Sequence, residues 1–250
     1  MELIKELNID LNHNELITFV GAGGKTTNMF NLARELKNKG KSVLVTTTTA
    51  IYYPENENCD RIIVLENKSE IVFQEILNYG ITAIGNKVTE EGKLKGIESG
   101  LVDHIYSKKI FDFVLVEGDG AKGRAIKVPA DHEPVIPKLS TMVIGVIGLD
   151  AVGKIINDDN VHRVKQFCNI TNKKVNDIIT EEDIVLISSN EKGVFKGAPK
   201  KSRKLLLLNK AMDIEDIGAA KRIKKVLKMK ICNEAFNIDI VIIGGEEERI

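Results

Sequence analysis

Two patterns of apolar residues alternate along this chain. Short continuous runs rich in Val, Ile and Leu predict buried strands, and apolar residues that recur every three or four positions predict helices. Because strands and helices alternate, we expect an α/β fold, with a mainly parallel sheet flanked by helices on both faces. The expected strands are 16–20, 42–47, 61–65, 81–84, 113–117, 142–147, 205–208 and 238–243, and the expected helices are 26–38, 69–79, 99–109, 160–168, 180–188 and 216–231.

Two stretches modify this simple alternation. The sequence VTEEGKLKGI, residues 88–97, is typical of a β-hairpin with Gly92 at its turn. The sequence KRIKKVLKMKI, residues 221–231, is basic and predicts a helix with a solvated cationic face, whose core face would hold Ile223, Val226, Leu227 and Ile231. The sequence shows no repeat or linker that marks a boundary, so we expect one domain over 1–250 with a small lobe at 86–98.

The first predicted strand runs directly into GAGGKTT and then into a predicted helix. A phosphate-binding loop requires this order, because glycines let backbone N–H groups approach phosphates and a helix N-terminus favours negative charge. Lys25 would add a positive charge, and the Thr26 hydroxyl would hold Mg²⁺. The fold expected is therefore P-loop NTPase-like. The predicted nucleotide-binding residues of this loop are Gly21, Ala22, Gly23, Gly24, Lys25, Thr26 and Thr27.

The spacing of this loop is unusual. The standard phosphate loop has four residues between its glycines, whereas Gly21 and Gly24 have two between them. This shortened spacing resembles the loop of the Mur ligases, so it does not exclude nucleotide binding. A dinucleotide fingerprint fits less well, since it would need a glycine at Thr26. The structural alternative is a glycine-rich turn before a helix, which leaves Lys25 unexplained.

Polar residues also follow two further predicted strands. Four threonines, 46–49, end one strand, and Glu117 and Asp119 end another. Ligands of parallel sheets bind beyond the carboxyl ends of strands, so we expect Thr48 and Asp119 to join Thr26 around Mg²⁺. Glu117 and Asp119 are the candidate catalytic residues, as carboxylates that hold metal or orient water. The alternatives are threonines that only extend a strand and acids in a surface turn.

A second group of polar residues lies in IKVPADHEPVIP, residues 126–137, where three prolines stiffen the chain. Cationic, imidazole and carboxylate groups gather there, and we expect the segment 127–133 to fold back beside the phosphate loop as a second ligand site. The polar sequence NDDNVHRV supplies a further histidine and arginine; each histidine is structural in the alternative interpretation. The predicted second-site residues are Lys127, His132, Glu133, His162 and Arg163.

Composition excludes several function classes. The chain of 250 residues has 36 basic and 36 acidic residues, so no overall field indicates nucleic acid or a membrane as partner. The sequence contains no apolar run long enough to span a bilayer, and its N-terminus lacks the features of a signal peptide. Three scattered cysteines without a C-x-x-C pair are typical of reduced thiols. We therefore expect a cytoplasmic protein.

Several of these motifs occur together and in a fixed order: GAGGKTT, VLVTTTTAIYYP, VLVEGDGAKGRAIKVPADHEPVIP, VIGVIGLDAVGK, VHRV and VFKGAP. In this combination the chain resembles the YqeC family over residues 16–213. Members of that family are described as accessory proteins of selenium-dependent molybdenum hydroxylases. The resemblance implies a role in maturing such enzymes, with a molybdenum hydroxylase or its maturation machinery as partner.

A broader resemblance concerns the GTPases that insert nickel into urease and hydrogenase. In such GTPases an N-K-x-D motif reads guanine, and Asn209 and Lys210 match its first two positions. Met212 stands at the acidic position, and Asp213 follows one residue late. A local bulge would bring Asp213 into place, so ATP and GTP both remain candidates. Three functions stay open: an accessory NTPase, a transferase acting on a selenium or molybdenum-cofactor intermediate, and a non-hydrolysing binding module.

Overall fold

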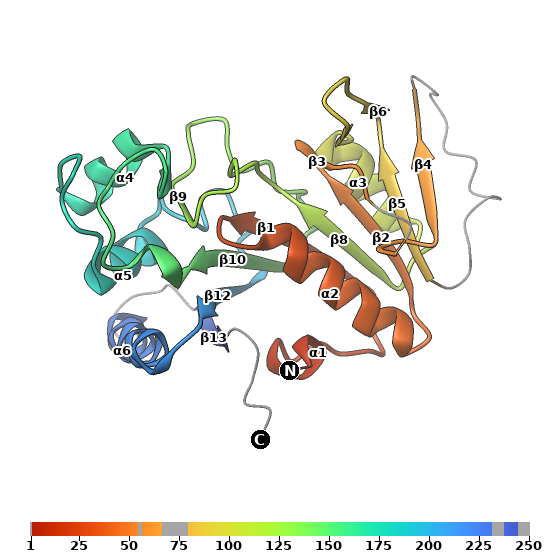
Figure 1. Cartoon of the computed structure of the whole chain (residues 1–250). Helices are drawn as coiled ribbons and strands as arrows, with labels where there is room; N and C mark the ends of the chain where they lie inside the picture. Colours follow the sequence, from red (N-terminus) through yellow and green to blue (C-terminus); the bar gives the residue numbers. More distant parts are fainter. Residues whose placement is uncertain (1, 55–56, 67–79, 232–237, 245–250) are drawn as a thin grey trace.

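The computed structural model describes residues 2–54, 57–66, 80–231 and 238–244. Its centre is an eight-stranded sheet in the order β13-β12-β10-β1-β8-β2-β5-β4, and all neighbouring strands run parallel (Figure 1). The predicted α/β fold is confirmed, and every predicted strand forms close to its expected bounds. The strands are β1 Glu15–Gly21, β2 Ser42–Thr47, β4 Arg61–Val64, β5 Gly80–Gly85, β8 Phe113–Glu117, β10 Met142–Gly148, β12 Arg203–Ala211 and β13 Asp239–Gly244.

Helices cover both faces of this sheet. They are α1 Leu3–Glu6, α2 Lys25–Asn38, α3 Ser99–Ser107, α4 Val164–Thr171, α5 Glu181–Ser189 and α6 Ile214–Ile231, with a 3₁₀ turn η2 at Leu149–Ala151. In the central strand β1, Ile17 and Phe19 belong to the apolar cluster that holds α2, whereas Leu16 belongs to the cluster that holds α3. Since alternate residues of a strand point to opposite faces, burial on both sides explains the continuous apolar strands.

One predicted helix, 160–168, is wrong at its start. Its first residues form β11, Val161–His162, which pairs in parallel with β9, Ile126–Lys127. Arg163 then adopts a left-handed conformation with φ of 72°, which a right-handed helix does not accept, so α4 begins only at Val164. A distant pairing partner thus overrides the local helical pattern. The helices predicted at 26–38, 99–109, 180–188 and 216–231 form, and the one at 69–79 lies outside the described residues.

A second, three-stranded sheet follows the carboxyl end of β2 (Figure 1). In it β7, Lys93–Lys95, pairs antiparallel with β3, Ala50–Tyr52, and with β6, Lys87–Val88. The β6–β7 unit is the predicted hairpin, and Gly92 in its turn has a φ of 69°, a conformation that glycine adopts at little cost. The β3 pairing, which the sequence did not indicate, carries Tyr52 and Lys93 toward the main sheet's carboxyl edge.

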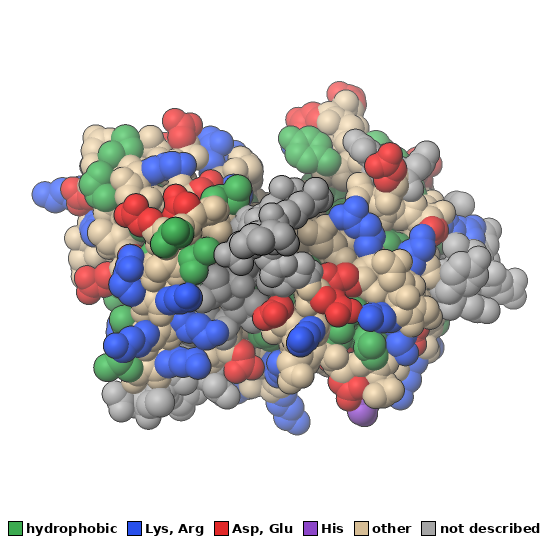
Figure 2. All heavy atoms as spheres, turned by 60° about the horizontal axis from the view of Figure 1, so that its bottom comes forward, with side chains coloured by type: hydrophobic (Ala, Val, Ile, Leu, Met, Phe, Trp, Pro, Cys, Tyr) green, Lys and Arg blue, Asp and Glu red, His purple; other side chains and the backbone are tan. Residues whose placement is uncertain are grey.

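Helix α6 carries the basic sequence 221–231. Ile223 and Leu227 are buried as predicted, but Val226 is 43% exposed, so its predicted place on the core face is wrong. The side chain of Ile231 lies outside the described part of the chain. Lys and Arg side chains gather on this side of the surface (Figure 2). Within the described residues, none of the helices combines the length and apolar character needed to cross a bilayer.

Candidate functional site

The loop between β1 and α2 has the backbone that its glycines predict. Gly21, Gly23 and Gly24 all have positive φ. A Cβ on Gly23 would lie 2.2 Å from the backbone nitrogen of Gly148, so this position requires glycine for space as well as for conformation. The loop is therefore pressed against the end of β10, and α2 begins at Lys25 immediately behind it.

Three of the loop's N–H groups already have protein partners. Gly21 N–H donates to Asp119 Oδ1 at 3.1 Å, Ala22 N–H to Val146 O at 2.9 Å, and Gly23 N–H to Arg124 O at 3.0 Å. The N–H groups that follow, from residues 24–27 at the start of α2, have no hydrogen-bond partner within the described part of the chain. In this shortened loop, the donors available to an anion are thus those of the helix N-terminus.

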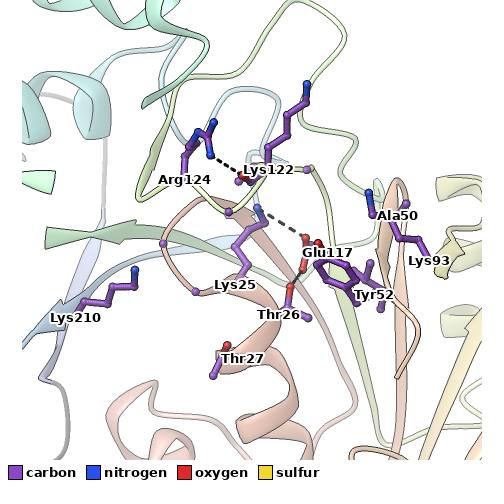
Figure 3. Close-up of a pocket in the computed structure, with 16 residues that line it drawn as sticks. Lys25, Thr26, Thr27, Ala50, Tyr52, Lys93, Glu117, Lys122, Arg124 and Lys210 are labelled. Atoms are coloured by element: carbon purple, nitrogen blue, oxygen red, sulfur yellow. Dashed lines mark hydrogen bonds and ion pairs between the residues drawn. The ribbon is translucent and has the colours of Figure 1, made fainter. Parts of the chain in front are cut away.

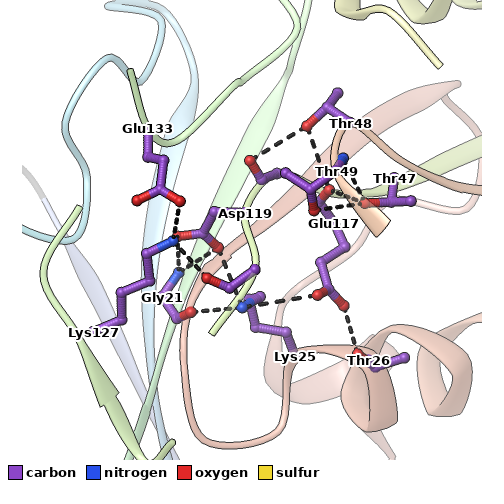
Figure 4. Close-up of polar contacts among 12 residues, drawn as sticks. Gly21, Lys25, Thr26, Thr47, Thr48, Thr49, Glu117, Asp119, Lys127 and Glu133 are labelled. Carbon is purple, nitrogen blue, oxygen red and sulfur yellow. Dashed lines mark hydrogen bonds and ion pairs between the residues drawn. The ribbon is translucent and has the colours of Figure 1, made fainter. Parts of the chain in front are cut away.

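Lys25 folds back over this loop and is almost fully buried. Its Nζ donates to Gly21 O at 2.6 Å and lies 3.2 Å from Asp119 Oδ1 and 3.9 Å from Glu117 Oε1 (Figure 4). A lysine in a purely structural glycine-rich turn would extend into solvent. Here its ammonium is held at the centre of a cluster of buried carboxylates, beside the free end of α2.

Glu117 ends β8 and points at the first turn of α2. The Thr26 hydroxyl donates to Glu117 Oε2 at 2.5 Å, and Glu117 is 5% exposed. Burial raises the pKa of Glu117, although Lys25 and the Thr26 hydroxyl both favour its charged form. A hydroxyl and a carboxylate oxygen therefore stand together at the helix start, and such oxygen ligands suit Mg²⁺.

The threonines of 46–49 tie strand ends together. Thr46 Oγ1 donates to Ile84 O at 2.7 Å, and Thr47 Oγ1 donates to Glu117 O at 2.9 Å. Thr48 Oγ1, expected near a metal, donates to Val135 O at 2.9 Å. These hydroxyls satisfy backbone carbonyls where the strands leave the sheet. The structure places Thr26 beside Glu117, whereas Asp119 and Thr48 contact other groups.

Asp119 lies between two lysines. Its Oδ1 is 3.2 Å from Lys25 Nζ, and its Oδ2 is 3.0 Å from Lys127 Nζ. Lys127, itself 1% exposed, also donates to Gly120 O at 2.6 Å and lies 3.0 Å from Glu133 Oε1. The segment 127–133 therefore lies against the phosphate loop, and the contact is made through Lys127 and Asp119 (Figure 4).

Glu133 extends this cluster toward α4. Arg163 Nη2 lies 3.4 Å from Glu133 Oε2, so five side chains of alternating charge form one chain from the phosphate loop to the start of α4. Burial opposes the charged form of Glu133, but hydrogen bonds and the charge of Lys127 outweigh it and lower the pKa of Glu133 to about 2. His132, by contrast, is exposed and is not one of these five charged side chains. The five residues in order are Lys25, Asp119, Lys127, Glu133 and Arg163.

His162 is next to Lys127 because β11 pairs with β9. Burial, together with the charges of Lys127 and Arg163, lowers the pKa of His162 to about 4. The imidazole is therefore neutral at physiological pH and can donate one hydrogen bond and accept another.

A pocket of about 470 Å³ opens above the start of α2 (Figure 3). Seven predicted residues line it: Gly23, Gly24, Lys25, Thr26, Thr27, Glu117 and Lys210. Arg124 also lines it. Sequence reasoning missed three others with useful side chains, namely Tyr52, Lys93 and Lys122. The glycine-rich sequence GDGAKGR after Glu117 was a signal for Lys122, because glycines let a backbone approach a ligand closely. No local signal indicated Tyr52 or Lys93.

Lys210 lies at the opposite end of the pocket from Tyr52 (Figure 3). Asn209 Nδ2 donates to Gly23 O at 2.7 Å and so supports the phosphate loop. A bulge in β12 gives Lys210 a φ of 61°, and its Nζ lies 3.1 Å from Asp150 Oδ2. Asp213 instead accepts a hydrogen bond from Asp216 N–H at the start of α6. Asp150, which the sequence reasoning overlooked, is thus the carboxylate beside Lys210.

Among the residues that the structure describes, no group of three or more His, Cys, Asp and Glu side chains converges as a metal site. The cavity thus offers a helix N-terminus, lysines and one hydroxyl–carboxylate pair. These are the groups that hold a phosphate and an Mg²⁺ that a ligand partly coordinates, since Mg²⁺ commonly keeps few protein ligands.

Comparisons with known proteins agree with this motif order. The family model described as "YqeC protein" matches residues 17–165. A relative from Escherichia coli (strain K12), "Uncharacterized protein YqeC", is 30% identical over 213 residues, which cover 85% of this chain and 82% of the relative. The chain belongs to the YqeC family.

Proposed function

We propose that this member of the YqeC family binds a nucleoside triphosphate with Mg²⁺ in the pocket above α2. The observation that carries the proposal is the convergence of Lys25, the unpartnered N–H groups of residues 24–27 and the Thr26–Glu117 pair at one cavity. Phosphate oxygens accept hydrogen bonds from the helix N-terminus, and Lys25 turns from Asp119 to the phosphates. Thr26 and Glu117 hold Mg²⁺.

The residues at the two ends of the pocket indicate which end would hold the terminal phosphates of the nucleotide and which its base. Glu117 and Thr26 mark the metal and hence the terminal phosphates. Asn209 and Lys210 mark the end where ribose and base lie, and ATP and GTP are both candidates. Lys122 and Arg124, which line the pocket near Lys25, add positive charge for the phosphate chain.

We propose further that the bound nucleotide is hydrolysed, with Glu117 acting at the metal and Asp119 setting the position of Lys25. Such sites are often slow until a partner completes them. Family resemblance supports a client of the molybdenum hydroxylase type, so that the nucleotide cycle would serve maturation of that enzyme.

A transferase is the second candidate, and one observation favours it. The pocket extends past Thr26 and Glu117 to Tyr52 and Lys93, which leaves room for an acceptor beyond the terminal phosphate. Tyr52 is 76% exposed, and such a ring at a pocket wall suits stacking on a planar ligand. A transferase would pass the phosphoryl group to that acceptor, whereas an NTPase releases orthophosphate.

Calorimetric titration with ATP and GTP, each with Mg²⁺, tests nucleotide binding. Lys25→Ala removes a charge-assisted contact worth about 1.5–3 kcal/mol, so binding should weaken by about ten- to a hundredfold. Lys138→Ala is the control, because Lys138 is exposed and does not line the pocket. Equal affinity of the wild type and Lys25→Ala for both nucleotides would refute the proposal.

A further inference from the structure

A second cavity, of about 300 Å³, adjoins the nucleotide pocket. Two of its lining residues, Lys122 and Arg124, also line the first pocket and so form a common wall. The remaining lining residues come from a distant part of the sequence, 158–163. The complete lining is Lys122, Arg124, Asp158, His162 and Arg163.

The fold builds this cavity by non-local pairing. β9 and β11 run side by side, which brings His162 next to Lys127 and places Arg163 directly after the strand. Arg163 takes the left-handed conformation, φ 72°, which costs an ordinary side chain of order 1 kcal/mol or more. Arg124 is fixed by donating its Nε–H to Asp158 O. Arg124 and the backbone of Arg163 are therefore held in place before any ligand arrives.

The charges around this cavity are arranged asymmetrically. Three lining residues are cationic, His162 is neutral, and Asp158 is the one acid in the lining. Two further acids contact the cations from outside: Asp159 lies 3.7 Å from Arg124 and is exposed, and Glu133 lies 3.4 Å from Arg163. Arg163 Nε is buried and has no hydrogen-bond partner within the described residues. The guanidinium of Arg163 is thus only partly satisfied by the protein.

We propose that this cavity binds a second anionic ligand, a small phosphate-bearing molecule, next to the nucleotide pocket. Guanidinium groups form charge-assisted contacts with phosphate oxygens, and Arg124 and Arg163 supply two such groups to the lining of this cavity. Arg124 Nη1 also donates to Lys122 O at 3.3 Å. Neutral His162 can donate one hydrogen bond to the ligand, and without a charge it does not repel the neighbouring cations Lys127 and Arg163. The inference goes beyond nucleotide binding and stands without it, because Arg163 and His162 do not line the first pocket.

Pyrophosphate is a suitable probe, titrated calorimetrically at low ionic strength. The background is Lys25→Ala, which weakens the phosphate loop. Arg163→Asn in that background removes the guanidinium while keeping a residue that tolerates the left-handed conformation, and it should weaken pyrophosphate binding about tenfold or more. Lys165→Asn, an exposed position on α4, is the matched control and should change the affinity less than twofold. Inorganic phosphate, titrated in parallel, separates a single-phosphate ligand from a larger one.

Circular dichroism establishes that each variant folds. If Arg163→Asn does not fold, His162→Ala gives the second test, because His162 lines this cavity and not the first pocket. Failure of the Lys25→Ala protein to bind pyrophosphate or phosphate would overturn the proposal. So would equal losses in Arg163→Asn and Lys165→Asn, since those would indicate nonspecific charge attraction. Failure of nucleotide binding appears separately, as a wild type that binds neither ATP nor GTP.

Discussion

Lys127 Nζ lies 3.0 Å from Asp119 Oδ2, and both residues are 1% exposed. This contact joins the end of β9, where the proline-rich segment begins, to the glycine-rich loop, because Asp119 also accepts the Gly21 N–H. Burying the two charges is favourable only when both partners are present. The pair therefore links the stability of the fold to the geometry of the site.

Lys127→Met should lower the free energy of unfolding by about 3–5 kcal/mol, since it leaves the buried Asp119 and the partly buried Glu133 with one cation fewer. Lys37→Met is the control: Lys37 pairs with Asp60 at the surface, and its loss should cost about 1 kcal/mol or less. Urea unfolding of both variants measures the difference. Equal costs would show that the Lys127 contact has no special role.

Glu117→Gln should leave the protein folded and abolish most phosphate release from nucleotide. The amide keeps the shape of the side chain but removes the charge that Mg²⁺ requires. Asp119→Asn should have a similar effect through Lys25, whose position it fixes. Single-turnover assays measure the rate, with Glu191→Gln, at an exposed position that does not line the pocket, as control. Unchanged hydrolysis in both variants would assign these acids a structural role.

Asn209→Ala should weaken nucleotide binding about fivefold without large loss of stability. Its Nδ2 donates to Gly23 O at 2.7 Å, and a hydrogen bond of this kind contributes about 1 kcal/mol to holding the loop. The affinities for ATP and GTP should fall by the same factor, because the contact is to the loop. Titration of both nucleotides tests this. A selective loss of one nucleotide would instead assign Asn209 to base recognition.

His162 should make the protein less stable as the pH falls from about 6.5 toward about 4. Its pKa is about 4 in the folded protein and 6.5 in the reference state, so the unfolded chain binds more protons within that window. Above about pH 6.5 the contribution of neutral His162 to the free energy of unfolding is fully present. One proton changes stability by at most about 1.4 kcal/mol per pH unit, and solvent screening reduces this.

The measurement is urea unfolding at neutral pH and at about pH 5. His162→Gln should flatten the difference between the two conditions. His104→Gln, at an exposed position, should leave it as in the wild type. A pH dependence that is unchanged in His162→Gln would contradict the prediction.

The sequence by itself determined the main architecture. Apolar runs of strand length and the 3.6-residue period of the helices are local signals. Because the strands are buried on both faces of the sheet, their sequences are continuously apolar, and this made them predictable. The glycine-rich loop predicted to bind phosphate was also a local signal, because glycines, Lys25 and Thr26 lie within seven consecutive residues between a strand and a helix.

Only the tertiary structure decided which polar groups meet. Val161 and His162 became a strand because β9, far away in sequence, pairs with them. Thr48 turned to the carbonyl of Val135, and Asp119 came to lie between Lys25 and Lys127. Leaving a buried charge unpaired costs free energy, so each buried charged side chain pairs with an oppositely charged group that the fold places nearby. Because those partners come from separate segments, no local pattern records them.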